Sequence, residues 1–160
     1  MSKTVICRCP DINDADWHLK DQDWSGKYFY FEDVLHIFNS PVGWSKAVEA
    51  MRSDIVRKGY QALHPEMVLH VPGRFSGRIF TEIEDPKQYD ANVELFENAR
   101  ILTRVHRGPK SGLGNAIEEI KAFAQDRSHI LPGLIYQWQA SCAICGPRRG
   151  GEVVVLLARV

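Results

Sequence analysis

The sequence predicts an α+β fold in which one unit, made of a strand, a helix and two further strands, occurs twice. Two stretches of the chain begin alike with Phe-Glu-Asp or Phe-Glu-Asn, run through an apolar stretch to a proline, and continue into an amphipathic run: FEDVLHIFNSPVGWSKAVEAM (31–51) and FENARILTRVHRGPKSGLGNAIEEI (96–120). Each is followed by two short apolar segments around a glycine-containing turn. An internal repeat of this length indicates a doubled supersecondary unit. We divide the 160 residues, as a single domain, into an N-terminal extension (1–27), a first unit (28–85) and a second unit (92–160).

Each amphipathic run is expected to be a helix. In the first, Ala47, Val48, Met51 and Ile55 recur at helical spacing and the run stops at Gly59, a residue type that favours helix C-termini. The second run follows Ser111, a plausible N-cap, and its apolar face is formed by Leu113, Ala116, Ile117, Ile120 and Phe123.

Two strands are expected after each helix. Residues 67–71 and 78–83 flank the turn sequence PGRFSG, and residues 134–140 and 153–160 flank CAICGPRRGG. Apolar runs around a glycine-containing connection are typical of β-hairpins. In the N-terminal extension, residues 4–9 are a candidate edge strand. The aspartate-rich part is expected to be a solvated loop that holds Asp11, Asp14, Asp16, Asp21 and Asp23.

Composition narrows the classes of function. Hydrophobic residues make up 44% and charged residues 25% of the chain, which is typical of globular proteins. Twenty basic residues balance twenty acidic ones, so no excess positive charge favours direct binding to nucleic acid. The sequence has neither a signal-peptide pattern nor an apolar stretch of membrane-spanning length, and we expect a cytoplasmic protein with no membrane partner.

Three stretches resemble the GyrI-like family, which includes the effector-binding domains of multidrug-responsive regulators. They are ILTRVHRGPKSGLGNAIEEIKAF (101–123), LPGLIYQWQ (131–139) and VVVLLARV (153–160). The resemblance implies two pseudo-symmetric units that form one antiparallel sheet, with helices on one face and a central cleft. It further implies a stand-alone protein that sequesters or senses an aromatic or cationic organic molecule in that cleft.

The resemblance is incomplete at one position. Many drug-binding members carry a glutamate on the final strand, where this chain has Val155. The nearest acid, Glu152, is three residues away and is expected on the opposite face of a regular strand. Glu82 lies on the corresponding strand of the first unit, and by pseudo-symmetry it is the candidate for the acidic residue that would attract a cationic ligand. Cation binding therefore depends on Glu82.

A cleft for flat organic molecules requires aromatic walls and a few polar groups. The candidate ligand-binding residues are Phe38, Trp44, Tyr60, Phe80, Glu82, His106, Tyr136 and Trp138. The alternative is that the aromatic residues form the core between sheet and helices.

Two other functions stay open. Some stand-alone relatives hydrolyse strained, reactive molecules with a carboxylate, and Glu82 would be the catalytic residue in that case. Alternatively, the protein inhibits a larger partner such as gyrase, as the family name suggests. Three histidines, His36, His70 and His106, fall on predicted strands, but no HxH or HExxH pattern accompanies them.

The four cysteines form a C-x-C pair, Cys7 and Cys9, and a C-x-x-C pair, Cys142 and Cys145. C-x-x-C followed by glycine is typical of a zinc knuckle, and the first pair would complete a four-thiolate structural site if the fold brings the pairs together. The alternatives are two pairs of unligated thiols, or oxidation-sensitive thiols beside Arg148 and Arg149. No cofactor other than such a zinc ion is expected.

Overall fold

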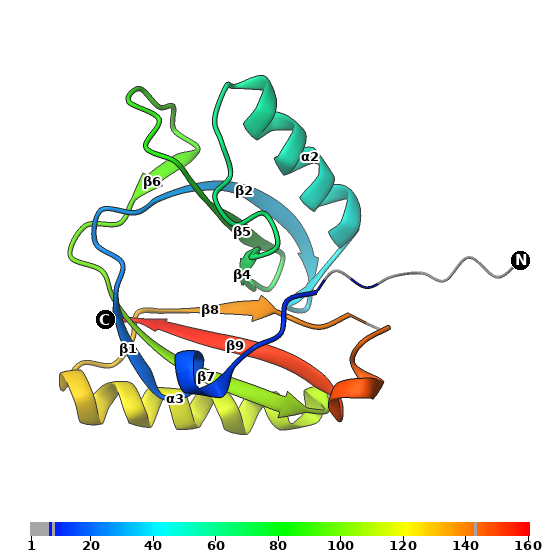
Figure 1. Cartoon of the computed structure of the whole chain (residues 1–160), viewed down its shortest axis with the longest axis vertical. Helices are drawn as coiled ribbons and strands as arrows, with labels where there is room; N and C mark the ends of the chain where they lie inside the picture. Colours follow the sequence, from blue (N-terminus) through cyan, green and yellow to red (C-terminus); the bar gives the residue numbers. More distant parts are fainter. Residues whose placement is uncertain (1–6, 8, 143) are drawn as a thin grey trace, which may run out of the picture.

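The computed structural model describes residues 7, 9–142 and 144–160. The described residues form one antiparallel sheet with the strand order β1-β7-β9-β8-β4-β5-β2-β3, and β6 pairs with β2 (Figure 1). Two long helices, α2 and α3, pack against it. The predicted α+β fold with a doubled unit is confirmed.

The first unit contains the four elements that the sequence predicts: β2 (Tyr28–Ile37), α2 (Trp44–Arg57), β4 (Leu69–Val71) and β5 (Ser76–Ile83). It also contains a short strand that the sequence does not predict, β3 (Ser40–Pro41), which pairs with β2. Helix α2 ends just before Gly59, whose φ of 79° is a backbone conformation that glycine adopts without strain. Strands β4 and β5 form the predicted hairpin.

The second unit repeats this order after the short strand β6 (Val93–Leu95). Its elements are β7 (Arg100–Gly108), α3 (Leu113–Ser128), β8 (Leu134–Gln139) and β9 (Glu152–Arg159). The prediction of Ser111 as N-cap is wrong, because Ser111 lies within a 3-10 turn, Lys110–Gly112, that leads into α3. A second 3-10 turn, Pro147–Arg149, lies in the β8–β9 connection.

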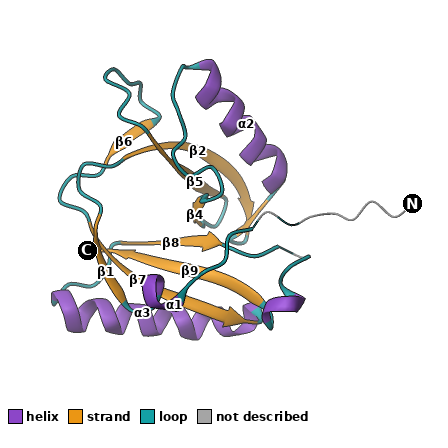
Figure 2. Ribbon diagram, in the orientation of Figure 1, coloured by secondary structure: helices purple, strands orange, loops and turns teal. Residues whose placement is uncertain are grey.

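Both helices lie on the same face of the sheet. Met51 and Ile55 of α2 pack with Tyr30 of β2, whereas Ile120 of α3 packs with Leu102 and Leu156. The two units join where β4 pairs with β8 at the centre of the sheet (Figure 2). Successive residues of a strand point to opposite faces. The predicted arrangement of helices on one face is therefore confirmed.

The opposite face is covered by a second core, formed by residues of both units together with the N-terminal extension. Phe29, Phe96 and Tyr136 form the aromatic centre of this core, and Trp24 and Ile12 of the extension are buried against it. The extension thus belongs to the packed domain.

The expectation that the aspartate-rich segment is a loop is wrong. It contains a helical turn, α1 (Asp14–Trp17), and an edge strand, β1 (Lys20–Asp23), which pairs with β7. Strand β1 reads KDQD and three of its four side chains are exposed, so no apolar alternation marks it in the sequence. Residues 4–6 and 8 of the candidate edge strand lie outside the described residues, and Cys7 and Cys9 are not part of a strand.

Within the part of the chain that the structure describes, no helix is both long and apolar enough to cross a membrane.

Candidate functional site

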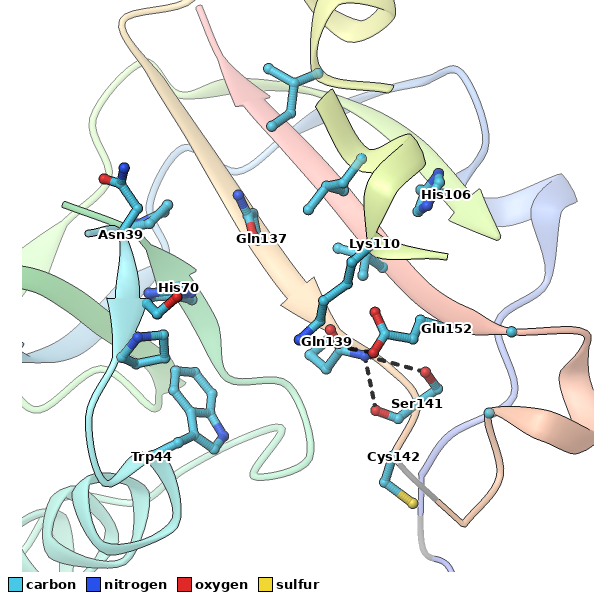
Figure 3. A pocket seen from close by; sticks show the side chains of 18 of the residues that line it. Asn39, Trp44, His70, His106, Lys110, Gln137, Gln139, Ser141, Cys142 and Glu152 are labelled. Carbon is cyan, nitrogen blue, oxygen red and sulfur yellow. Dashed lines mark hydrogen bonds and ion pairs between the residues drawn. The ribbon is translucent and has the colours of Figure 1, made fainter. Parts of the chain in front are cut away.

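A large cavity with a volume of about 980 Å³ lies on the helix face, at the junction of the two units (Figure 3). Helix α2 packs mainly on β2, and helix α3 packs mainly on β7 and β9. The central strands β4 and β8 lie between the strands that carry the two helices, and His70 of β4 and Gln137 and Gln139 of β8 line the cavity. The predicted central cleft corresponds to this position.

The first residues of the two helices supply equivalent apolar walls. Trp44 begins α2 and Leu113 begins α3, and both line the cavity, with Ile117 one turn further along α3. Gln137 and Gln139 of β8 lie between the two walls (Figure 3). They point to this face because they alternate with Tyr136 and Trp138, which are buried on the other face.

Polar groups gather on the side of the second unit. His106 Nε2 lies 3.0 Å from the carbonyl oxygen of Pro109, and Lys110 Nζ lies 3.9 Å from Glu152 Oε1. Gln139 Nε2 donates to the carbonyl oxygen and the hydroxyl of Ser141, at 3.2 and 3.3 Å. Lys110 and Glu152 both lie on this side of β8 in Figure 3. The ammonium of Lys110 thus offsets part of the charge of Glu152, whose Oε2 is buried without a hydrogen-bond partner among the described residues.

Two histidines form a direct pair at the first unit. His36 is 1% exposed, its Nδ1 lies 2.7 Å from the carbonyl oxygen of Val34, and its Nε2 lies 2.7 Å from His70 Nε2. A carbonyl only accepts, so His36 Nδ1 carries a proton and, in the neutral ring, its Nε2 accepts from His70 Nε2–H. Burial, with the neighbouring His36 as a second cause, lowers the pKa of His70 to about 4. His70 therefore presents a neutral imidazole to the cavity at pH 7.

The candidate acid Glu82 lies on the other face of the sheet, in a separate cavity of about 180 Å³. Its side chain is 6% exposed, and both carboxylate oxygens accept from Lys27 Nζ, at 3.0 and 3.1 Å. His64 Nε2 lies 4.0 Å from the same carboxylate. Three tryptophans form the walls of this cavity: Trp17, Trp24 and Trp138.

The structure does not bring the eight predicted ligand-binding residues into one cleft. Trp44 and His106 line the large cavity, and Glu82 and Trp138 line the small one. Phe80 and Tyr136 lie in the core on the small cavity's side of the sheet, which agrees with the alternative interpretation of these aromatics.

The remaining two predicted residues line neither cavity. Tyr60 packs against the core beneath α2, with its ring centroid 5.9 Å from that of Tyr30. Phe38 is 70% exposed at the turn between β2 and β3. Glu152 points away from the face that Val155 occupies, as expected from strand alternation, and this places Glu152 in the wall of the large cavity.

Sequence reasoning missed the His36–His70 pair and the two glutamines of β8. The histidines were visible only as separate polar residues on strands, and their contact depends on the pairing of β4 with β5 and of β5 with β2. The glutamines had a signal in the sequence, because Gln137 and Gln139 alternate with Tyr136 and Trp138 on a predicted strand.

The two cysteine pairs come together in space, as the four-thiolate hypothesis requires. The four Sγ atoms all lie within 4.8 Å of one another. Cys142 Sγ lies 3.4 Å from Cys7 Sγ and 3.8 Å from Cys145 Sγ. Cys142 also lines the large cavity, so the cluster lies at the edge of that cavity.

Two comparisons with known proteins identify the class of fold and the family. The C-terminal domain of EcmrR superimposes with a TM-score of 0.64 at 11% identity, over 89% of this chain and 96% of that domain. EcmrR in its cryo-EM complex with DNA (EcmrR-RPo) gives a TM-score of 0.59 at 12% identity, over 87% of this chain and 55% of that one. Identities this low show the fold alone, and the predicted GyrI-like fold is confirmed.

The profile of a family described as bacterial hydrolase matches residues 1–160, so this chain belongs to that family. The search against curated proteins found no match.

Proposed function

We propose that the protein binds a small organic molecule in the large cavity, and thereby sequesters or senses it. The observation that carries this proposal is the cavity of about 980 Å³ that is lined by residues of the central strands β4 and β8 and of both helices. Sites for small molecules are typically concave, mostly apolar, about 300–1,000 Å³ in volume and located between structural units. The GyrI-like effector-binding fold that the chain shares with the C-terminal domain of EcmrR supports this use.

The lining favours a flat, uncharged and mostly apolar ligand. Trp44, Leu113 and Ile117 offer apolar contact, while the amides of Gln137 and Gln139 offer hydrogen bonds. The neutral imidazole of His70 adds no charge. Glu152, the acid in the wall, lies 3.9 Å from the ammonium of Lys110, which offsets part of its charge. We therefore expect neutral aromatic molecules to bind more tightly than cationic ones.

Binding of a neutral and a cationic dye tests this site. We expect Nile red to gain fluorescence on binding and rhodamine 6G to bind more weakly. Trp44→Ala removes an aromatic wall and should weaken Nile red binding about tenfold. Phe38→Ala is the matched control, because Phe38 is exposed and lines neither cavity. Equal affinities of the two variants would show that the large cavity is not the site.

Hydrolysis of a small reactive molecule is the second candidate function, and membership of the bacterial hydrolase family favours it. The Glu82 pocket has the chemistry for it. The Glu82 carboxylate, both of whose oxygens hydrogen-bond to Lys27 Nζ, can accept a proton from water or attack an electrophilic carbon. Because the pocket holds only about 180 Å³, the substrate would be small.

Activated esters and epoxides of low molecular mass are the substrates to test. Glu82→Gln should abolish turnover while Nile red binding in the large cavity persists. Glu66→Gln is the matched control, since Glu66 lines the same pocket with a half-exposed carboxylate. If Glu82→Gln keeps wild-type turnover, the small pocket is not a hydrolytic centre.

A further inference from the structure

The connection between β8 and β9 contains a tight turn at Cys142 and Cys145, which we call the knuckle. The backbone N–H of Cys142 donates to Cys145 Sγ at 3.2 Å. Gly146 N–H closes the turn by donating to the carbonyl oxygen of Cys142 at 2.9 Å. Backbone N–H groups aimed at sulfur stabilise negative charge there, which is the form of cysteine that binds metals.

The N-terminal segment reaches this knuckle through contacts that do not involve sulfur. Arg149 Nη1 donates to the carbonyl oxygen of Pro10 at 2.7 Å, and its Nη2 donates to that of Cys9 at 3.3 Å. The same guanidinium forms an ion pair with Asp11 at 3.0 Å. Arg149 therefore fixes the C-x-C pair over the C-x-x-C pair, and the backbone N–H of Cys9 donates to Cys7 Sγ at 3.3 Å.

From this arrangement we propose that Cys7, Cys9, Cys142 and Cys145 bind one zinc ion as a closed four-thiolate site, which joins the N-terminal segment to the β8–β9 connection. A tetrahedral zinc site with Zn–S bonds of about 2.3 Å places its sulfurs about 3.8 Å apart. The observed separations of 3.4 and 3.8 Å, with all four atoms within 4.8 Å, surround this value.

The ligand set selects the metal and its role. Four soft thiolates in a compact cluster favour zinc over magnesium or calcium, which prefer oxygen ligands. Because four protein ligands fill a tetrahedral shell, no position is left for substrate or water, and the ion is structural. The guanidinium of Arg149, adjacent to Cys9, offsets part of the negative charge of the loaded site.

The position of the site connects it to the large cavity. Cys142, Gly146 and Pro147 all line that cavity. An ion that fixes the knuckle therefore also fixes one wall of the cavity, with the N-terminal segment behind it.

Metal content of the full chain, purified under reducing conditions, tests the proposal. We expect about one zinc per chain by elemental mass spectrometry, and a loss of about tenfold or more in zinc content in Cys7→Ser and in Cys142→Ser. Asp11→Asn is the matched control: it removes a charge from the same contact with Arg149 but no sulfur, and it should keep the zinc. Full zinc content in Cys7→Ser would overturn the assignment of the N-terminal pair.

A second measurement does not depend on how the variants fold. Wild-type protein stripped with a chelator and titrated with Co²⁺ should develop thiolate-to-cobalt charge-transfer absorption and the visible bands of a tetrahedral site, both removed by one equivalent of Zn²⁺. Folded protein that lacks these bands and contains no zinc would overturn the proposal. Stoichiometric iron in place of zinc would also overturn it. The same holds for disulfides between these cysteines, which would lower the mass of the untreated protein by two hydrogens each.

Discussion

His36 Nε2 lies 2.7 Å from His70 Nε2 because the neighbouring residue on β5, Gly77, has no side chain. A Cβ atom at residue 77 would lie 2.4 Å from His36 Cε1 and 2.5 Å from the carbonyl oxygen of Val71. Both distances are far shorter than van der Waals contact. The close approach of the two imidazoles beside the cavity therefore requires glycine at this position.

Replacement of this glycine should destabilise the fold and disturb the histidine pair. Gly77→Ala forces His36 and the β4 backbone apart, and we expect a loss of about 3 kcal/mol in the free energy of unfolding, from overpacking. Gly114→Ala is the matched control, because nothing lies within 4 Å of a Cβ there and the residue is in helix α3. It should be neutral or stabilise by about 0.5 kcal/mol. Urea unfolding distinguishes the two, and equal stabilities would refute the steric argument.

The lowered pKa of His70 predicts how stability depends on pH. The unfolded pKa is 6.5 and the folded pKa is about 4, so at pH values below about 6.5 the unfolded chain binds more protons than the native one. The lowered pKa of His70 therefore does not reduce the free energy of unfolding at pH 7.5. This free energy falls as the pH decreases from about 6.5 towards 4. Allowing for solvent screening, we expect this site to contribute a loss of about 1–2 kcal/mol at pH 5.

Urea unfolding at pH 7.5 and pH 5 measures this effect. His70→Gln keeps a hydrogen-bond donor for His36 but does not titrate, so it should lose less stability between the two pH values than the wild type. His129→Asn replaces an exposed histidine with a residue that tolerates its left-handed backbone, and it should behave as the wild type does. An unchanged pH dependence in His70→Gln would contradict the lowered pKa.

Most of the fold could be predicted from the sequence, because local signals mark its elements. The apolar spacing of Val48, Met51 and Ile55 indicates a helix, and Gly59 marks its end. Strand β1 could not be predicted this way, since Asp21 and Asp23 lie on an edge strand that is held by backbone pairing with β7 rather than by apolar burial.

Less of the candidate site was predictable, because its composition depends on which face of the sheet the helices cover. Strand alternation shows that Trp138 and Gln137 point in opposite directions, but not which of them faces the helices. The face is set by the pairing of β4 with β8, which places Leu69 beside Trp138 and His70 beside Gln137. These two strands are far apart in the sequence, so the pairing has no local signal.

Replacement of Lys27 in the Lys27–Glu82 ion pair should destabilise the fold more than replacement of Glu82. The Glu82 side chain is 6% exposed and the Lys27 side chain is 35% exposed, so only the lysine reaches water when its partner is removed. Lys27→Met leaves a buried carboxylate without its cation, and we expect a loss of about 1–3 kcal/mol, greater than that of Glu82→Gln. Lys87→Met, which breaks the exposed pair with Asp85, should cost less than about 0.5 kcal/mol. Thermal and urea unfolding compare the three, and a larger loss in Glu82→Gln than in Lys27→Met would contradict the asymmetry.

Trp24 and Trp138 allow a matched test of the hydrogen bond made by a buried indole. They are 4% and 5% exposed, and both line the small cavity. Trp24 Nε1 donates to Gln22 Oε1 at 2.9 Å, whereas Trp138 Nε1 is buried with no hydrogen-bond partner among the described residues. Replacement by phenylalanine removes similar apolar area at each position, but only at Trp138 does it also remove an unpaired donor.

We therefore expect Trp24→Phe to cost about 1–2 kcal/mol more in the free energy of unfolding than Trp138→Phe. Urea unfolding at pH 7.5 measures both, with circular dichroism to confirm that each variant keeps its sheet. Equal losses would mean that the Trp138 N–H is paired in solution. Because this indole borders the Glu82 pocket, its partner would then be a water molecule or ligand in that pocket, and Trp138 would act as a donor to whatever the pocket holds.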